Sequence, residues 1–400
     1  MASRNLLSEV ARHTGSVFLA TLAIQTTTFA LIAITALILA PPEFARLSLI
    51  VAATMLAAGV FDLGLGITIT KKYNETGDAA YLRFGFSVWI AMVPASVVLS
   101  AIAWIAASDG DIALGILLGG LLNIWNGLRA ADQAREDYLS FCKSSAAFAV
   151  VRLVGGGAAL VALRDPVATA VAIYGLPLVV FPFSRSFQYL AGAFTERRQF
   201  AREHVWYATH VYLSALTFIM ILYLPQFVIA SRLDATAVST YGLILTFASP
   251  ISLLIYSLRG VMLPKMLGSA HELETMLWSR GGLAAITAVW TLMMAGAVVV
   301  GWGLEMFYGD KYPAIRPAFL IFFTGFSATG LIGLYSLSVH TQGVPHLSLM
   351  INAGKLALLV PVLLVSGAML NAIVGIVAAA MIVGEVLMTV TLWRRRPGCE

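Results

Sequence analysis

The chain has 400 residues, of which 60% are hydrophobic and only 11% are charged, and its mean hydropathy is +0.88. A soluble globular chain averages roughly 45–50% apolar and ~25% charged residues, so the composition excludes that class. The net charge of +5 does not indicate nucleic-acid binding, because the basic residues lie between apolar segments and not in one patch. The two cysteines, Cys142 and Cys399, predict neither a disulfide framework nor a metal site.

Twelve apolar segments are long enough, or nearly long enough, to cross a hydrocarbon layer about 30 Å thick as helices. We therefore expect an all-α polytopic membrane protein with twelve transmembrane helices and no cofactor. The expected spans are 17–40, 44–70, 84–107, 112–128, 145–163, 167–183, 212–230, 238–258, 282–304, 314–337, 347–366 and 371–392.

The distribution of lysine and arginine predicts the orientation of these spans. With an even number of spans both termini lie on one side, and eighteen basic residues fall on that side against five on the other. Because cytoplasmic loops carry the excess of basic residues, both termini are expected in the cytoplasm. The five basic residues on the opposite side are Arg46, Arg164, Arg232, Lys311 and Arg316.

Six spans precede the middle of the chain and six follow in the same orientation, which favours two parallel repeats. The predicted organisation is two pseudo-symmetric six-helix bundles around a central cavity. The connection between them mixes apolar and basic residues at near-helical spacing, as an interfacial helix would. The predicted parts are a cytoplasmic arm (1–16), the first bundle (17–183), the interfacial linker (184–210), the second bundle (211–393) and a cytoplasmic tail (394–400).

Four ionisable residues lie inside spans, each about nine residues from the cytoplasmic end of its helix: Asp62, Arg152, Lys355 and Glu385. Charges at this depth are costly and mark functional sites or ion pairs. In one interpretation Arg152 and Lys355 attract an anionic substrate, while Asp62 or Glu385 takes up a proton. In the other, two ion pairs, Arg152 with Asp62 and Lys355 with Glu385, hold helices together.

Uncharged polar side chains also lie inside spans. Gln25 and Gln226 belong to the first spans of the two halves, and Asn352 lies one turn before Lys355. In one interpretation Gln25 and Gln226 line a shared cavity and bind sugar hydroxyls, and Asn352 belongs to the same substrate path. Hydrogen bonds between helices are the alternative explanation for all three.

Glycines and prolines occur within the predicted apolar helices. Gly115, Gly119 and the run Gly155 to Gly157 are expected to permit close helix packing, with no phosphate-binding loop implied. Prolines within or near spans are expected to bend them. These prolines are Pro94, Pro177, Pro182, Pro225, Pro250 and Pro361.

Signatures of enzymes are missing from the sequence. The six histidines form no HExxH or other spaced ligand set, and no nucleophile elbow or Walker loop occurs. The predicted outer loops are too short for a folded catalytic domain. We therefore expect a transporter and not an enzyme, with no metal site.

Several stretches resemble a known family. A first span, a short Pro-Glu-Phe loop and a span ending in Asp62-Leu63-Gly64-Leu65-Gly66 are similar to the start of polysaccharide flippases of the multidrug/oligosaccharidyl-lipid/polysaccharide exporter superfamily. Later stretches that fit the same pattern are Leu233-Asp234-Ala235 leading to Tyr241, Phe307-Tyr308-Gly309-Asp310-Lys311-Tyr312, and Asn352 with Lys355.

The resemblance implies a monomeric protein that flips an undecaprenyl-pyrophosphate-linked oligosaccharide across a bacterial inner membrane by alternating access. Such a flippase serves the biosynthesis of O-antigen or exopolysaccharide, and a polysaccharide polymerase with its chain-length machinery would be its partner. Flippases for the peptidoglycan precursor resemble a longer architecture with two extra helices, which this chain does not show.

Three alternatives remain open at the level of sequence. An exporter of small cationic drugs from the same superfamily would be expected to carry more acids than bases in its cavity, and the four residues above are two of each sign. A membrane-bound polysaccharide enzyme would show a large outer loop or a catalytic histidine and acid. A scaffold protein would have a dry interface and no charged cavity.

Overall fold

The computed structural model describes residues 21–176, 188–191, 202–251, 278–335, 345–365 and 369–394. Within these ranges the regular structure is helical and no strand occurs. The chain divides into two compact units, Met1–Leu216 and Thr217–Glu400. The predicted bundle and linker boundaries remain predictions, although the range 184–210 belongs to the first unit.

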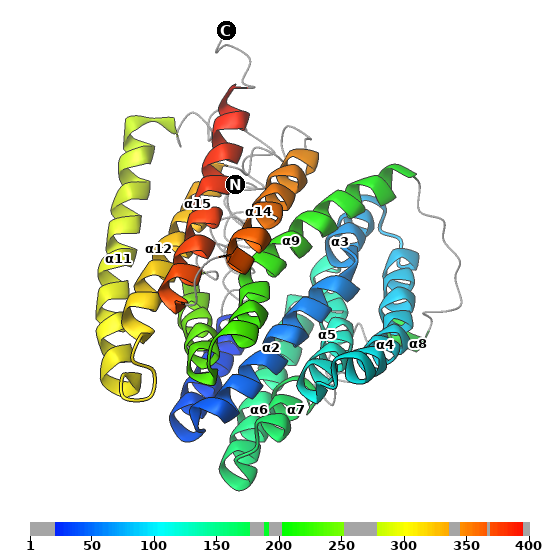
Figure 1. Ribbon diagram of the computed structural model, residues 1–400. Coiled ribbons are helices and arrows are strands. Elements are labelled where there is room, and N and C mark those ends of the chain that lie inside the picture. Colours follow the sequence, from blue (N-terminus) through cyan, green and yellow to red (C-terminus); the bar gives the residue numbers. More distant parts are fainter. Residues whose placement is uncertain are drawn as a thin grey trace. The chain divides into compact units, whose positions relative to one another are not determined.

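The first unit holds a helix over Thr21–Ile38, a series of labelled helices, and the beginning of α9 (Figure 1). Connections between its helices are short where both ends are described, as expected for neighbours in a bundle. The labelled helices are α2 (Pro41–Asp62), α3 (Leu65–Thr76), α4 (Ala80–Ala107), α5 (Gly110–Ala134), α6 (Tyr138–Leu163), α7 (Pro166–Tyr174), α8 (Gln188–Ala191) and α9 (Arg202–Arg232).

The second unit holds the rest of α9, a helix over Ala235–Ile251 and four further labelled helices. The connection between α11 and α12 covers only residues 309–314, so this loop holds no folded domain. The four helices are α11 (Arg280–Tyr308), α12 (Ile315–Ile332), α14 (Pro345–Val365) and α15 (Leu370–Arg394).

Ten helices of the described residues are long and apolar enough to cross a membrane. They correspond to ten of the twelve expected spans. The other two expected spans are 167–183 and 238–258. Their first parts lie in the shorter described helices α7 and Ala235–Ile251, and their last residues lie outside the described residues. The chain is therefore a multi-pass membrane protein, as its composition predicts.

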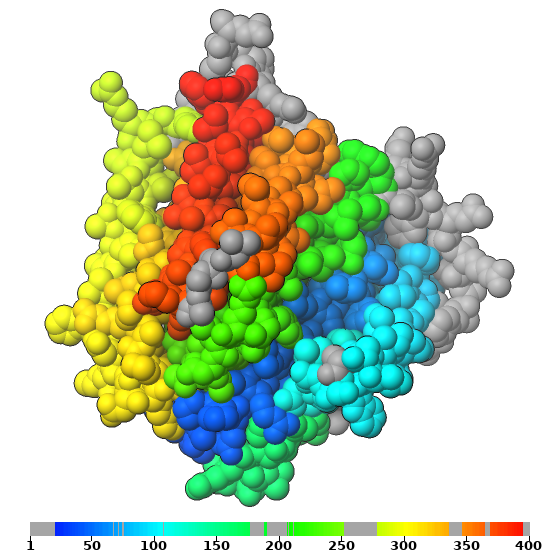
Figure 2. Space-filling view, viewed as in Figure 1, coloured from blue at the N-terminus to red at the C-terminus, as the bar shows by residue number. Residues whose placement is uncertain are grey.

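The outward side of α11 is covered with large apolar side chains. Leu292, Val299 and Met306 are 72–74% exposed, and α11 lies open along its length in Figure 2. These three residues are seven positions apart, which places them on one face of the helix. In water this face would be costly to expose, so it is the face that hydrocarbon covers.

Glycines set the distance between α2 and α5, which pack side by side in the first unit. A Cβ added at Gly119 would lie 2.6 Å from the Cβ of Ala57 and 2.6 Å from the carbonyl oxygen of Thr54. Gly115, one turn earlier, contacts the same face of α2. The predicted role of both glycines in close helix packing is confirmed. For Gly157 it is wrong, because no described residue lies within 4 Å of a Cβ added there.

The second unit uses the same device between α12 and α15. A Cβ at Gly325 would lie 2.5 Å from the Cβ and 2.6 Å from the Cα of Ala378. In hydrocarbon, helices associate through such close contacts because lipid tails are as apolar as the side chains themselves. Each unit therefore contains a helix pair whose backbones meet without intervening side chains.

The expected continuous span over 44–70 is wrong in one respect, because the helix breaks directly after Asp62. Leu63 and Gly64 adopt the left-handed conformation, with φ angles of 51° and 67°, and α3 begins at Leu65. The apolar pattern runs through the break, which is why hydropathy alone did not reveal it. Asp62 thus lies at the end of α2 and not inside a longer helix.

Helix α9 packs against this break. The hydroxyl of Tyr212 donates a hydrogen bond of 2.8 Å to the carbonyl oxygen of Val60, and a Cβ added at Gly64 would lie 2.9 Å from the carbonyl oxygen of Ala208. Gly64 therefore meets two requirements, a positive φ and a close approach by α9. The boundary between the units falls inside α9, after Leu216.

We predict that replacing Gly119 with alanine destabilises the protein by about 1–3 kcal/mol, because the new methyl group has no room against the backbone of α2. Gly157→Ala is the matched control, because no described residue lies within 4 Å of its added Cβ. That substitution is expected to be neutral or to stabilise helix α6 by up to about 1 kcal/mol. Thermal unfolding of both variants in detergent measures the difference, and equal midpoints would contradict the packing role of Gly119.

A second pair of variants separates backbone strain from packing at the break. Gly64 and Gly77 both have positive φ angles, but of the two only Gly64 has neighbours within 4 Å of an added Cβ in the described part of the chain. Gly77→Ala should cost only the strain of a left-handed residue, about 1–2 kcal/mol. Gly64→Ala should cost more, since it also pushes α9 away. If the two variants unfold at the same temperature, the docking of α9 on Gly64 adds nothing to stability.

Candidate functional site

The second unit contains a buried ion pair. Lys355 on α14 and Glu385 on α15 lie with Nζ and Oε1 3.1 Å apart, and their side chains are only 4% and 9% exposed. The second of the two alternatives drawn from the sequence therefore holds for this pair. Together the two groups carry no net charge, so the second unit gains no free cation from Lys355.

A glycine makes room for this pair. Gly384 precedes Glu385 on α15, and a Cβ added there would overlap the Cε of Lys355. The lysine stem thus lies across the bare backbone of α15, which brings its ammonium group to the carboxylate. The other carboxylate oxygen of Glu385 and the hydroxyl of Thr389, one turn later, are buried with no hydrogen-bond partner among the described residues.

Arg152 lies in a different environment in the middle of α6. Its side chain is buried, and its guanidinium carbon lies 4.3 Å from the ring centre of Phe148 and 5.3 Å from that of Tyr174. Phe148 in turn stacks on Trp125, with ring centres 4.4 Å apart and planes 9° apart. The aromatic faces offer the cation a negative quadrupole in place of water.

Two oxygen atoms complete the surroundings of Arg152. Its Nε donates to the carbonyl oxygen of Ile173 over 3.1 Å, and an Nη donates to the hydroxyl of Thr28. Three helices, Thr21–Ile38, α6 and α7, therefore fix the orientation of the guanidinium. Its remaining donors are available, because a guanidinium carries five N–H groups and these bonds use two.

The predicted pair between Arg152 and Asp62 does not form. Within the described residues, no carboxylate lies within 4 Å of the guanidinium of Arg152. Asp62 is instead half-buried at the end of α2, where an added Cβ at Gly66 would lie 3.8 Å from its Oδ1. The guanidinium of Arg152 points instead toward α7 and the helix Thr21–Ile38, where Ile173 and Thr28 accept its hydrogen bonds.

Arg129 lies beside Arg152 and is not among the residues predicted for the site. The expected span 112–128 ends just before it, but α5 continues to Ala134, so Arg129 lies inside the helix. Arg129 is close enough to Arg152 for the two charges to repel. A span of that length is short for a bilayer, and this was the available signal that the helix extends further.

The three amides remain in the unit where each was expected. Gln25 is half-buried in the helix Thr21–Ile38, Gln226 is 1% exposed in α9, and Asn352 is 6% exposed in α14. Their roles in a substrate path stay predictions, as does proton uptake by Asp62 or Glu385. In the part of the chain that the structure describes, no group of three or more histidine, cysteine, aspartate or glutamate residues could hold a metal ion.

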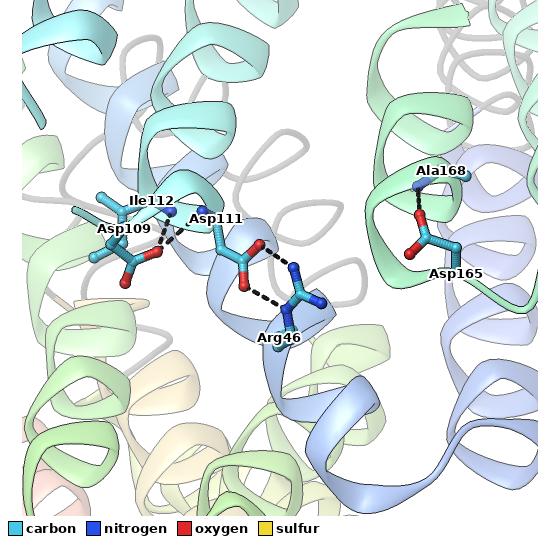
Figure 3. Close-up of polar contacts among 6 residues, drawn as sticks. All are labelled: Arg46, Asp109, Asp111, Ile112, Asp165 and Ala168. Atoms are coloured by element: carbon cyan, nitrogen blue, oxygen red, sulfur yellow. Dashed lines mark hydrogen bonds and ion pairs between the residues drawn. The ribbon is translucent and has the colours of Figure 1, made fainter. Parts of the chain in front are cut away.

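A different set of charges lies at the starts of α2, α5 and α7 in the first unit (Figure 3). Arg46 on α2 binds Asp111 on α5 through two hydrogen bonds of 2.8 and 2.9 Å. Asp109 and Asp165 accept backbone N–H bonds at the first turns of α5 and α7 and so cap these helices. Asp111 is thus paired with Arg46, and the other two acids bond to the starts of helices. These contacts explain all four residues as structural.

An ion pair in the second unit joins Arg316 on α12 to Glu305 on α11, with Nη1 and Oε2 2.7 Å apart. Both partners are partly exposed, with side-chain exposures of 34% and 55%. Surface pairs of this kind contribute about 0–1 kcal/mol. Two of the five basic residues predicted for the outer side are thus paired with an acid.

Comparison with known proteins identifies solved structures with a similar fold. No protein-family model matches the chain, and none of the curated proteins matches it. Among solved structures, a point mutant of the Vibrio cholerae MATE transporter VcmN has a TM-score of 0.62 at 12% identity, and the match covers 98% of each chain.

Two further structures are similar over most of the chain. A multidrug resistance MATE family transporter of the MOP superfamily, in an inward-facing conformation, has a TM-score of 0.64 at 15% identity, and the match covers 94% of this chain and 98% of that one. The lipid II flippase MurJ, in an inward closed conformation, has a TM-score of 0.65 at 11% identity, with coverages of 94% and 87%. The predicted fold class, an all-α polytopic membrane protein built like these transporters, is confirmed.

The buried pair generates a prediction about stability. Lys355→Met leaves the carboxylate of Glu385 buried without its partner and should destabilise the protein by about 3–5 kcal/mol. The double variant Lys355→Met with Glu385→Gln removes both charges and should recover most of that loss. Thermal unfolding in detergent measures both effects. A double variant no more stable than Lys355→Met would show that the ion pair does not account for the role of Lys355.

Proposed function

We propose that this protein is an alternating-access transporter that moves a polyprenyl-diphosphate-linked oligosaccharide across the bacterial inner membrane for the synthesis of a surface polysaccharide. The fold shared with MATE transporters and MurJ supports transport. The main support for an anionic substrate is Arg152, a buried cation with no acid beside it among the described residues.

The energetic argument concerns the cost of a charge in hydrocarbon. A buried cation without a counter-ion is expensive, and aromatic faces with two oxygen acceptors offset only part of that cost. An anionic substrate that enters the bundle supplies the missing counter-charge. Binding therefore removes a penalty already present in the empty protein, which favours anions over neutral sugars.

The same observation counts against the second candidate, an exporter of cationic drugs. Positive charge at Arg152 and Arg129 raises the energy of a cation in the first unit. In the second unit, the carboxylate of Glu385 is already paired with Lys355 and is not free to bind a cation. We therefore propose the flippase function, although MATE multidrug transporters share the fold.

In the proposed cycle, Arg152 receives the diphosphate in the half of the membrane predicted to face the cytoplasm. Movement of the anion outward is favoured by an inside-negative membrane potential, by about 2.3 kcal/mol per charge per 100 mV. Asp62, half-buried at the break between α2 and α3, is the proposed proton acceptor if protons couple to the cycle. The sugar chain would meet the amides Gln25, Gln226 and Asn352.

The test is a deletion strain of the source bacterium complemented with variants. We predict that Arg152→Gln abolishes export and causes lipid-linked oligosaccharide to accumulate in the inner leaflet, with the protein level unchanged. Arg46→Gln is the matched control, since it removes one arginine of the first unit from an exposed ion pair and should leave export nearly intact. Normal export by Arg152→Gln, or no accumulation in the deletion strain, would overturn the proposal.

A further inference from the structure

Two neighbouring guanidinium groups of the first unit have no acid beside them among the described residues. Arg129 on α5 and Arg152 on α6 are near enough for mutual repulsion, and among the residues that the structure describes neither has a carboxylate within 4 Å. Like charges in a low-dielectric interior repel more strongly than in water. Their persistence together indicates that something anionic belongs between or beside them.

The two arginines have matching surroundings. Arg129 lies 4.8 Å from the ring centre of Phe141, and its Nη2 is 3.5 Å from the hydroxyl of Thr21. Arg152 lies 4.3 Å from the ring centre of Phe148 and donates to the hydroxyl of Thr28. Each guanidinium is thus held between a phenylalanine ring of α6 and a threonine hydroxyl of the helix Thr21–Ile38.

These partners repeat at one spacing. Thr21 and Thr28 are seven residues apart on one helix, and Phe141 and Phe148 are seven residues apart on another. Seven residues are two helical turns, about 10 Å, and return to the same face. The arginines therefore occupy two successive levels of one seam, which lies between the helix Thr21–Ile38 and α6.

Donor groups remain open at both levels. The Nε of Arg129 is buried with no hydrogen-bond partner in the described part of the chain. The hydroxyl of Tyr174, whose ring packs on Arg152, is likewise buried and without a partner there. Buried donors of this kind are rare in folded proteins unless a ligand or water occupies the site. Arg129 supplies a donor at the first level, and Tyr174 at the second.

We propose that Arg129 and Arg152 together form a binding site for a diphosphate, each guanidinium taking one phosphoryl group. This inference rests on the proposed function and specifies its substrate group. A diphosphate distributes its negative charge over two adjacent phosphoryl groups. A monophosphate carries its charge on one phosphoryl group and so cannot occupy both guanidinium groups in this way. Guanidinium is suited to each end because its planar fork matches two phosphoryl oxygens.

The experiment measures binding to the purified full-length protein in detergent, without transport. The probes are inorganic pyrophosphate, inorganic phosphate, geranylgeranyl diphosphate and geranylgeranyl monophosphate, with calorimetry as the readout. Both diphosphates should bind more tightly than their monophosphate counterparts. Inorganic pyrophosphate should compete with geranylgeranyl diphosphate, which distinguishes recognition of the diphosphate from recognition of the lipid.

Variants locate the site. Arg129→Gln should weaken diphosphate binding by roughly tenfold or more, as loss of hydrogen bonds to a charged group does, and should change monophosphate binding by less than about threefold. Arg129→Lys keeps the charge and the fold, and should lose most of the preference for diphosphate because it lacks the fork. Arg46→Gln is the control and should bind as the unaltered protein does.

The outcomes separate this inference from the proposed function. Diphosphate binding that is unaffected by both Arg129 variants, or equal binding of mono- and diphosphates, overturns the two-arginine site even if export still requires Arg152. Diphosphate binding that depends on Arg129, in a protein that does not flip lipid-linked oligosaccharide in reconstituted vesicles, keeps the site and overturns the flippase function.

Discussion

A guanidinium buried in an apolar bundle must be solvated by the protein itself, and the arrangement of the first unit depends on meeting this condition for Arg152. The side chain reaches a carbonyl oxygen on α7 and a hydroxyl on the helix Thr21–Ile38. Both helices must therefore approach α6 closely. Gly156, one turn beyond Arg152, permits this, because a Cβ there would lie 3.1 Å from Leu31 and 3.2 Å from Ile173.

The second unit solves the same problem differently. Lys355 is as deeply buried as Arg152, but a carboxylate lies 3.1 Å from it. Under the predicted internal repeat, the span 145–163 corresponds to the span 347–366, and Arg152 and Lys355 fall at matching positions within them. Their surroundings are not equivalent: one cation keeps its charge uncompensated by any described acid, and the other is neutralised. Within the described residues, the positive charge at this depth lies in the first unit.

Much of the fold followed from hydropathy and small residues, since ten expected spans and the packing of Gly115 and Gly119 appear in the structure. The break after Asp62 did not, because Leu63 and Gly64 continue an apolar pattern whose backbone conformation hydropathy does not report. Pairing was predictable only in part, since the sequence offered the pair of Lys355 with Glu385 as one of two alternatives. Position along a span gives the depth of a charge but not the helix face or the neighbour it meets, so Arg129 and the absence of a pair between Asp62 and Arg152 emerged only in three dimensions.

Because Lys355 contacts Gly384, the size of the side chain at one position limits the size that the other position can accept. The long stem at one position occupies the space in which any side chain at the other would begin. Neither residue can be exchanged alone without loss, yet a short residue at 355 would free 384 for alanine or serine. Any redesign of this helix pair must therefore treat lysine with glycine as a single unit of substitution.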